Sequence, residues 1–186
     1  MKHKILFVER KPSEFVSIEN AFRCIAAHLP NDFETEFQHV PYGNRFTDTI
    51  LNLFLFRKKP ADIYHITGHI HYLALLFAPR NTVLSIMDVR FLYIRPGPRR
   101  WLLRKLYLEW PVKRLAFITA ISEQTKVEIV EQTGCDERKI HVLDLPLPFS
   151  DLRTPTEPAH GPKPIILQIG TMENKNISNP TNQQLS

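Results

Sequence analysis

Short β-rich segments alternate with helical segments along most of the chain, and this alternation constrains the fold more than any other feature. The predicted strands are residues 4–8, 33–40, 62–67, 82–89, 116–121 and 140–145. The predicted helices between them are residues 17–29, 44–59, 70–77, 99–110 and 122–133. Strands separated by helices of these lengths favour a parallel sheet with helices on both faces. The sequence therefore predicts an α/β fold with a doubly wound parallel sheet.

Local signals fix several of these boundaries. Ser122 is a suitable N-cap, Glu123 places an acid in the first turn, and Gly134 suits a left-handed residue after the helix. Pro111 is expected to end the preceding helix, because a proline in a helix removes a hydrogen bond. The β-rich segment 82–89 is expected to be a central strand.

Composition excludes some classes of protein. The six glycines form no Gly-x-Gly-x-x-Gly motif, which argues against a nicotinamide or flavin enzyme. Two cysteines do not make a disulfide framework, and no run approaches the ~20 apolar residues that span a bilayer. The first ten residues hold too short an apolar core for a signal peptide. We therefore expect a cytoplasmic protein, and its net charge of +5 favours anionic partners.

The chain divides into three predicted parts. Residues 1–146 have the size of one α/β domain, and residues 147–163 are a polar, proline-rich linker. Residues 164–186 begin like a second α/β domain, with an apolar run that ends at Gly170 and a polar turn at Lys175, and continue as a polar, disordered tail. A domain that starts and does not continue leads us to expect a truncated protein.

Two loops after predicted strands carry charged candidates. Ligands of open α/β sheets bind beyond the carboxyl ends of the strands. Arg10 and Lys11 follow the first strand and could bind an anionic ligand; a solvated turn is the alternative. Asp88 ends the segment 82–89 and could orient a sugar or alcohol hydroxyl; a loop-capping role is the alternative.

Three histidines, His65, His69 and His71, follow one another at the end of the third predicted strand. We expect no metal site there, because no carboxylate or cysteine nearby completes a set of ligands. Gly68 suits a tight turn that lets a ligand approach the backbone. The imidazoles could serve as hydrogen-bonding groups or as a proton acceptor near neutral pH. The alternative, a buried and satisfied histidine, is expected for at least one of the three.

The segment 90–114 carries eight cations against one acid, Glu109, with tyrosines and tryptophans between them. Cations beside amphipathic aromatic residues suit the headgroup region of an anionic membrane. The same composition would suit nucleic acid, and a half-buried helix with solvated charges needs no partner. We favour a membrane and expect no nucleic acid. The predicted membrane contacts are Arg99, Arg100, Trp101, Arg104 and Lys105.

Taken together, these segments resemble the bacterial glycosyltransferases of family 4. The resemblance covers most of residues 1–176, and rests on the order of KILFVERKPSEFVSIENAF, ADIYHITGHIHYLALL, TVLSIMDVRFLY, ITAISEQTKVEI and ILQIGTMENKN. That family has the GT-B architecture of two Rossmann-like domains, with chemistry in the cleft between them. The resemblance implies that residues 1–146 are the acceptor-binding domain and that residues 164–186 begin the donor-binding domain.

The resemblance also implies a reaction and its residues. The parent enzyme would transfer a hexose from a nucleotide sugar to a polysaccharide or lipid-linked acceptor at the inner face of the cell membrane, with retention and without a bound metal or cofactor. The implied catalytic residues are His65, His69 and Asp88. The implied acceptor side also includes Gly68 and His71, beside Arg10 and Lys11. Gly170 and Lys175 match residues that contact the donor diphosphate.

Departures from the family limit what the chain can do alone. Met87 stands where many relatives have histidine, and Asp144-Leu145-Pro146 stands where Asn-Pro is common. The paired glutamates that hold the donor lie in the part of the second domain that is missing here. We therefore expect no activity from this chain alone. The alternatives are a binding module that pairs with a separate donor-binding chain, and a membrane or nucleic-acid binder that uses only the segment 90–114.

Overall fold

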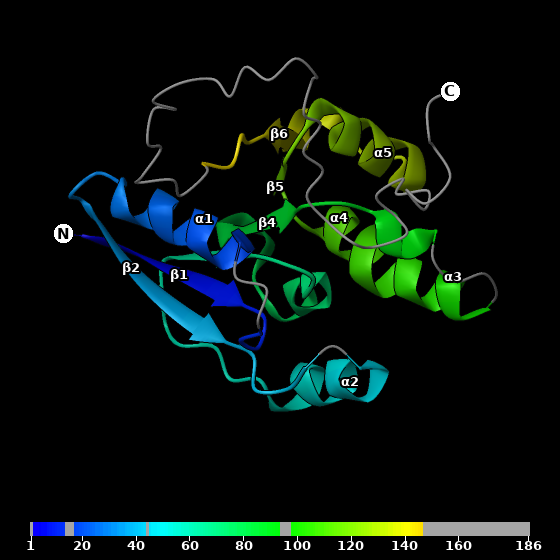
Figure 1. Ribbon diagram of the computed structural model, residues 1–186, viewed down its shortest axis with the longest axis horizontal. Coiled ribbons are helices and arrows are strands. Elements are labelled where there is room, and N and C mark those ends of the chain that lie inside the picture. The colour runs from blue at the N-terminus through cyan, green and yellow to red at the C-terminus, as the bar shows by residue number, and fades with distance from the viewer. Residues whose placement is uncertain (1, 14–16, 44, 94–97, 147–186) are drawn as a thin grey trace, which may run out of the picture. The chain divides into compact units, whose positions relative to one another are not determined.

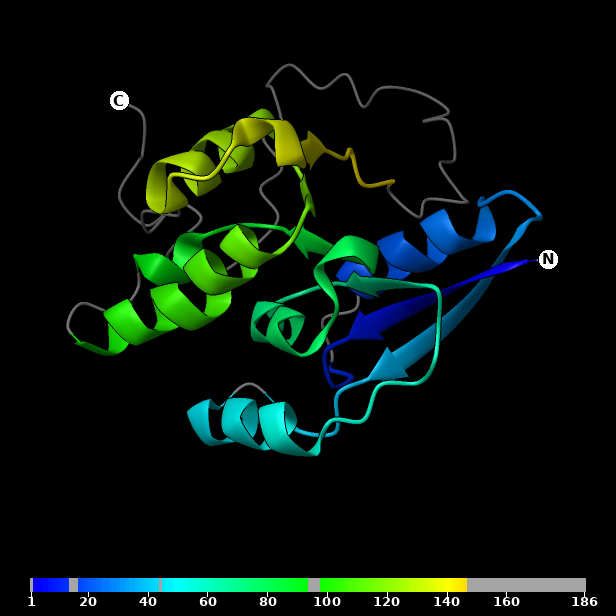
Figure 2. The ribbon, with the colours of Figure 1, turned by 180° about the vertical axis from the view of Figure 1, so that it is seen from behind.

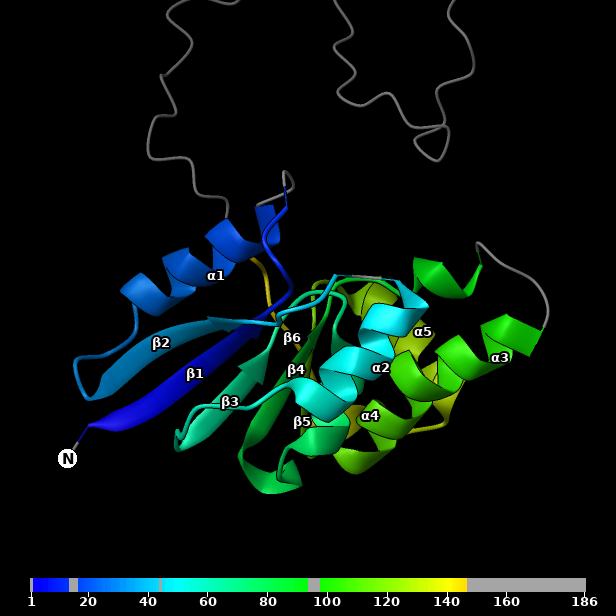
Figure 3. The ribbon, with the colours of Figure 1, turned by 90° about the horizontal axis from the view of Figure 1, so that it is seen from below.

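A computed structural model describes residues 2–13, 17–43, 45–93 and 98–146, apart from the side chains of Pro98 and Arg99. Its sheet has six parallel strands in the order β2-β1-β3-β4-β5-β6. Figure 1 shows β2 beside β1 at one edge of this sheet, and every strand is labelled in Figure 3. The strands are β1 (His3–Glu9), β2 (Phe33–His39), β3 (Ile63–Ile66), β4 (Thr82–Ile86), β5 (Phe117–Ala120) and β6 (Ile140–Val142). The predicted α/β class is confirmed, and β4 is central as expected.

Helices lie on both faces of this sheet. The α-helices are α1 (Ser17–Ala27), α2 (Phe46–Leu55), α3 (Pro98–Arg104), α4 (Trp110–Arg114) and α5 (Glu123–Thr133). The 3₁₀ turns are η1 (His71–Leu76), η2 (Pro79–Asn81), η3 (Arg90–Leu92) and η5 (Glu137–Lys139), and η4 (Lys105–Glu109) is π-helical. Figure 3 shows α1 on one side of the sheet, with α2 and α4 on the other.

Two apolar layers follow from the alternation of side chains along β1. Ile5 and Phe7 face α1 and pack with Phe22, whereas Leu6 and Val8 belong to the larger core on the opposite face. The larger core also contains side chains of η1, η4, α4 and α5. Candidate side chains can therefore be assigned to one layer or the other from their position on a strand.

The predicted boundaries of α5 are confirmed, whereas two other helices differ from the prediction. The Ser122 side chain accepts a hydrogen bond from the Thr125 amide, and Gly134 ends the helix with φ of 63°. The predicted helix 44–59 is shorter, since α2 ends at Leu55 and Phe56 is extended. The predicted helix 70–77 forms the 3₁₀ turns of η1 instead of an α-helix.

The expectation that Pro111 ends a helix is wrong. Residues 98–114 form one helical rod through α3, η4 and α4, which lies beside α5 (the green rod next to the yellow helix in Figure 2). The π-helical turn explains why the proline is tolerated: the Trp110 amide bonds to the Lys105 carbonyl, and Pro111 then falls in the first turn of α4. An amide is dispensable in a first turn. In the described part, no helix is long and apolar enough to cross a membrane.

Candidate functional site

The candidate site lies where the chain order reverses in the sheet. β2 pairs with one edge of β1 and β3 pairs with the other, so the loops that follow β1 and β3 separate at this point. Ligands of open α/β sheets bind at such a position, beyond the carboxyl ends of the strands. The loops after β1, β3 and β4 begin at this edge. They contain Arg10, Gly68 and Asp88, which the sequence predicted separately.

Arg10 and Gly68 are brought together. The Thr67 amide donates to the Val8 carbonyl at 3.0 Å, which ties the loop after β3 to β1. A Cβ atom added to Gly68 would lie 3.9 Å from Cγ and Cδ of Arg10, an ordinary contact. Crowding therefore does not demand glycine here, whereas the φ of 68° does, since L-residues rarely adopt it.

Arg10 is held by an acid that sequence reasoning missed. Its Nε atom lies 2.6 Å from Oε1 of Glu19, in the first turn of α1, and both side chains are largely buried. Burial alone would raise the pKa of the Glu19 carboxyl, but hydrogen bonds from Arg10 and from its own backbone, with the nearby arginine charges, lower it overall. Glu19 therefore fixes the position of the guanidinium. Lys11 is exposed, so a solvated turn stays possible for that residue.

His65 lies on the α1 side of the sheet, away from the other two histidines. Its ring stacks on Phe7 at 5.2 Å and meets Phe22 edge-on at 5.0 Å. Its Nε2 atom lies 2.7 Å from the Ser85 hydroxyl, which also bonds to Thr119. Burial lowers the pKa of His65 to about 4. This arrangement is the satisfied core histidine that was the alternative for one of the three, and it does not support the predicted catalytic role.

His71 lies in the opposite layer and is only half satisfied. The residue is fully buried, and its Nδ1 atom lies 2.9 Å from the Tyr107 carbonyl oxygen. A carbonyl only accepts, so Nδ1 carries the proton. Burial, assisted by His69 and opposed by the backbones of Tyr107 and Gly68, lowers the pKa of His71 to about 3, so the ring is neutral and Nε2 is an acceptor. That Nε2 atom is buried and has no hydrogen-bond partner.

His69 lies beside His71, and Asp88 lies beside His69. The His69 ring centre lies 6.0 Å from that of His71, and its Nε2 atom lies 3.9 Å from Oδ2 of Asp88. The other carboxylate oxygen of Asp88 accepts from the Arg90 amide at 3.0 Å. The capping role suggested for Asp88 thus uses one oxygen and leaves the second toward His69. Both side chains are more than a third exposed, so a ligand can reach them.

This geometry suits hydroxyl groups better than a metal ion. The three histidines do not converge, and the described residues contain no group of three or more side chains that could hold a metal. Instead, a buried acceptor without a donor, Nε2 of His71, lies near an exposed pair of an imidazole and a carboxylate. A buried acceptor that lacks a donor is costly, and a ligand hydroxyl would remove that cost. Because Nε2 of His71 is buried, a ligand hydroxyl reaches it only if neighbouring side chains move aside.

Sequence reasoning also missed Glu9, the last residue of β1. Its side chain is fully buried between two guanidinium nitrogens of Arg23, each at 3.2 Å, and Nε2 of His39 at 3.0 Å. Burial raises the pKa of the Glu9 carboxyl, although Arg23 and His39 oppose this. The available signal was the alternation of β1, which puts residue 9 on the same face as Ile5 and Phe7. We assign Glu9 to holding α1 on β1 and β2.

Part of the predicted basic segment is used inside the protein. Arg104 and Lys105 pair with the buried Glu109 at 2.8 Å and 2.5 Å. The hydrogen bond from Lys105 is the main reason why the pKa of Glu109 is lowered, although burial opposes it. Arg104, at the end of α3, also donates to the Gln132 carbonyl at 2.6 Å, which ties α3 to α5. These contacts give the two cations a structural role, and their membrane role stays a prediction.

The remaining predicted residues are exposed or lie outside the described part. Arg100 is exposed, with its guanidinium 5.9 Å from the Tyr93 ring centre, and Trp101 is 60% exposed. The side chain of Arg99 lies outside the described residues, as do Gly170 and Lys175, the predicted donor contacts. The predicted linker 147–163 and the segment 164–186 lie outside them as well.

Comparison with known proteins does not identify a family. Neither the profile of any known protein family nor any curated protein sequence matches this chain.

Proposed function

We propose that residues 1–146 are the acceptor-binding domain of a glycosyltransferase similar to those of family 4. The parent enzyme transfers a hexose from a nucleotide sugar to a polysaccharide or lipid-linked acceptor. The observation that carries this proposal is the half-satisfied His71 near the exposed His69–Asp88 pair, in the loops that follow the parallel strands β3 and β4. A sugar acceptor offers several neighbouring hydroxyls, which suit one buried acceptor and an exposed carboxylate.

Each side chain has a defined part in this proposal. A hydroxyl of the acceptor sugar enters beside the His69 ring and donates to Nε2 of His71, which is neutral and cannot donate there. A neighbouring hydroxyl donates to the free oxygen of Asp88, which is the candidate to accept a proton as the hydroxyl attacks. Arg10, held by Glu19, supplies positive charge beside Gly68 for an anionic group of the acceptor.

The donor side of the reaction needs a second domain, from the parent enzyme or from a partner chain. Negative charge accumulates on the departing nucleoside diphosphate, so cationic and amide groups stabilise the transition state. Gly170 and Lys175 are the proposed contacts with that diphosphate. The proposal places the parent enzyme in the cytoplasm, at the inner face of the cell membrane. It requires no metal or other cofactor.

Calorimetric titration with alkyl hexosides, and separately with UDP- and GDP-hexoses, tests this proposal. We expect weak binding of at least one alkyl hexoside and no measurable binding of the nucleotide sugars. Asp88→Asn is expected to weaken hexoside binding about tenfold, the effect of losing one hydrogen bond to a charged group. Asp136→Asn is the matched control, because Asp136 is exposed and pairs only with its neighbour Arg138 among the ion pairs found. Hexoside binding that ignores Asp88→Asn, or nucleotide-sugar binding without hexoside binding, would contradict the proposal.

A further inference from the structure

Helix α2 buries polar side chains and exposes apolar ones. Its polar residues Thr49 and Asn52 are 1% and 0% exposed. The apolar residues on its other side are exposed by between 39% and 72%: Ile50, Leu51, Phe54 and Leu55. A surface helix ordinarily buries its apolar stripe and exposes its polar one. Because α2 does the reverse, its outer face lacks the apolar partner that such a stripe requires.

Hydrogen bonds fix this orientation. The Thr49 hydroxyl lies 2.6 Å from the Tyr107 hydroxyl of η4. The Asn52 amide donates to the Tyr72 hydroxyl at 2.8 Å and exchanges two bonds with the backbone of Tyr42. Turning the apolar stripe inward would break this buried network and leave several polar groups without partners, which is costly. The outward position of Phe54 and its neighbours is therefore a stable property of the domain.

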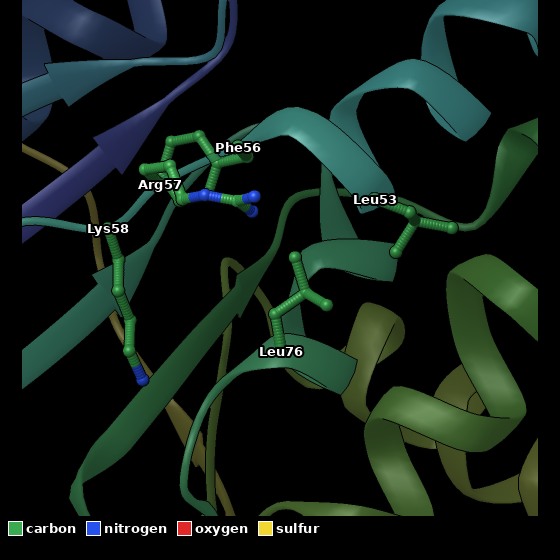
Figure 4. Close-up of a pocket in the computed structure, with 5 residues that line it drawn as sticks. All are labelled: Leu53, Phe56, Arg57, Lys58 and Leu76. Carbon is green, nitrogen blue, oxygen red and sulfur yellow. The ribbon is translucent and has the colours of Figure 1, made fainter.

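Cations border the apolar stripe. Arg57 and Lys58 are exposed, follow the end of α2, and line a groove of about 280 Å³ together with three apolar side chains, Leu53, Phe56 and Leu76. Figure 4 shows Leu76 rising from η1 toward the end of α2, between Leu53 and Arg57. The Lys58 ammonium lies 4.9 Å from the ring centres of Tyr64 and Phe77. The Arg57 guanidinium donates to the Phe54 carbonyl, so this cation is held beside the stripe.

We propose that this surface, the α2 stripe with Arg57 and Lys58, docks the domain on an anionic membrane. Exposed phenylalanine and leucine side chains enter the boundary between headgroups and acyl chains, while adjacent cations meet anionic headgroups. A second copy of the chain fits less well, because a symmetric contact through α2 would bring the same cations together. The inference does not depend on sugar transfer.

The α2 surface fits a membrane better than the segment predicted from the sequence. Arg104 and Lys105 of that segment are held by Glu109, whereas Arg57 and Lys58 form none of the ion pairs found in the described part. The exposed aromatic residue of α3, Trp101, lacks the neighbouring row of exposed leucine and isoleucine side chains that α2 provides. Substitutions at Phe54 and at Trp101 distinguish the two surfaces.

Flotation of the full chain with phosphatidylcholine vesicles, with and without phosphatidylglycerol, tests the proposal. We expect binding only to the anionic vesicles, with loss of binding at high salt. Phe54→Glu is expected to weaken binding at least about tenfold, because an apolar side chain that enters the membrane is replaced by a charged one. Val127→Glu is the matched control, since Val127 is an exposed apolar residue on α5. Arg57→Gln with Lys58→Gln should weaken binding, and Lys2→Gln with Arg138→Gln, at other exposed cations, should weaken it less.

Several outcomes would overturn this inference. They are the absence of binding to anionic vesicles, equal effects of Phe54→Glu and Val127→Glu, and loss of binding in Trp101→Glu but not in Phe54→Glu. Formation of a dimer that Phe54→Glu dissociates, without vesicle binding, would assign the surface to a second copy instead. The unfolding midpoint of each variant is measured first. Phe54→Glu is expected to leave it unchanged because Phe54 is 72% exposed.

Discussion

Two histidines a few residues apart, His65 and His71, lie in opposite layers of the domain and bond through different ring nitrogens. His65, between the sheet and α1, bonds through Nε2 to Ser85. His71, between the sheet and η4, bonds through Nδ1 to Tyr107 and leaves Nε2 without a partner. Both rings are kept neutral by burial. The comparison teaches that the direction of the pKa shift is the same for both rings, and that only the unused acceptor of His71 singles it out for the ligand role that we propose.

The largest expected effect is on the layer that encloses His65. Phe22 is fully buried and meets the His65 ring edge-on, so Phe22→Ala removes a core side chain and opens a cavity. We expect a loss of about 3–5 kcal/mol in the free energy of unfolding, measured by denaturant titration. Phe54→Ala is the control, because the same residue type is exposed there. Similar losses in both variants would mean that α1 does not pack on the sheet as described.

Acid should destabilise the domain through its neutral histidines. In the unfolded chain a histidine binds a proton below about pH 6.5, whereas in the folded domain the pKa of His71 is lowered to about 3 and the ring stays neutral above that pH. The free energy of unfolding is therefore unaffected by the titration of His71 above about pH 6.5. Below that pH the unfolded chain gains a proton that the folded domain does not, and the free energy of unfolding falls by about 1.4 kcal/mol per pH unit for His71. His65 acts in the same direction down to about 4.

The pH effect is measured by denaturant unfolding between neutral pH and about pH 4.5, in the parent chain and in His71→Gln. In the variant, the slope of the free energy of unfolding against pH should be smaller by the contribution of about one proton, because glutamine does not titrate. Parallel curves for the two proteins would show that His71 titrates in the folded domain much as it does in the unfolded chain. That result would remove the reason for treating Nε2 as an acceptor.

A smaller effect is expected when His65, like His71, has a ring nitrogen without a hydrogen-bond partner. Ser85→Ala removes the partner of Nε2 of His65 and leaves that ring nitrogen without a hydrogen bond. We expect a loss of about 1–3 kcal/mol in the free energy of unfolding, with hexoside binding unchanged. A change in hexoside binding would show that the layer beside α1, and not the one beside η4, communicates with the ligand.

The sequence predicted the architecture because that depends on strong periodic signals. Apolar strands with helices between them specify a parallel sheet, and Ser122 and Gly134 mark the ends of α5 through their own side chain and backbone. The Gly68 turn, Arg10 and Asp88 were found because ligand loops follow the carboxyl ends of strands. These features are local, or they follow from chain order alone.

Features that depend on packing between distant segments were not predicted. Pro111 stays inside a helical rod because a π-helical turn precedes it, and the pattern of apolar residues in the sequence does not predict such a turn. The inverted orientation of α2 depends on Tyr107 and Tyr72, which come from later elements. The layer of each histidine and the role of Glu109 as a partner for Arg104 and Lys105 also required the folded arrangement.

The most direct test of the sugar-binding proposal is a nitrogen NMR spectrum of the histidine rings during titration with an alkyl hexoside. The structure predicts two neutral rings, with the proton of His71 on Nδ1 and an unbonded acceptor at Nε2. We expect the hexoside to shift Nε2 of His71 and the ring of His69, and to leave His65 unchanged. A shift confined to His65, or no shift of His71 at saturating hexoside, would contradict the account.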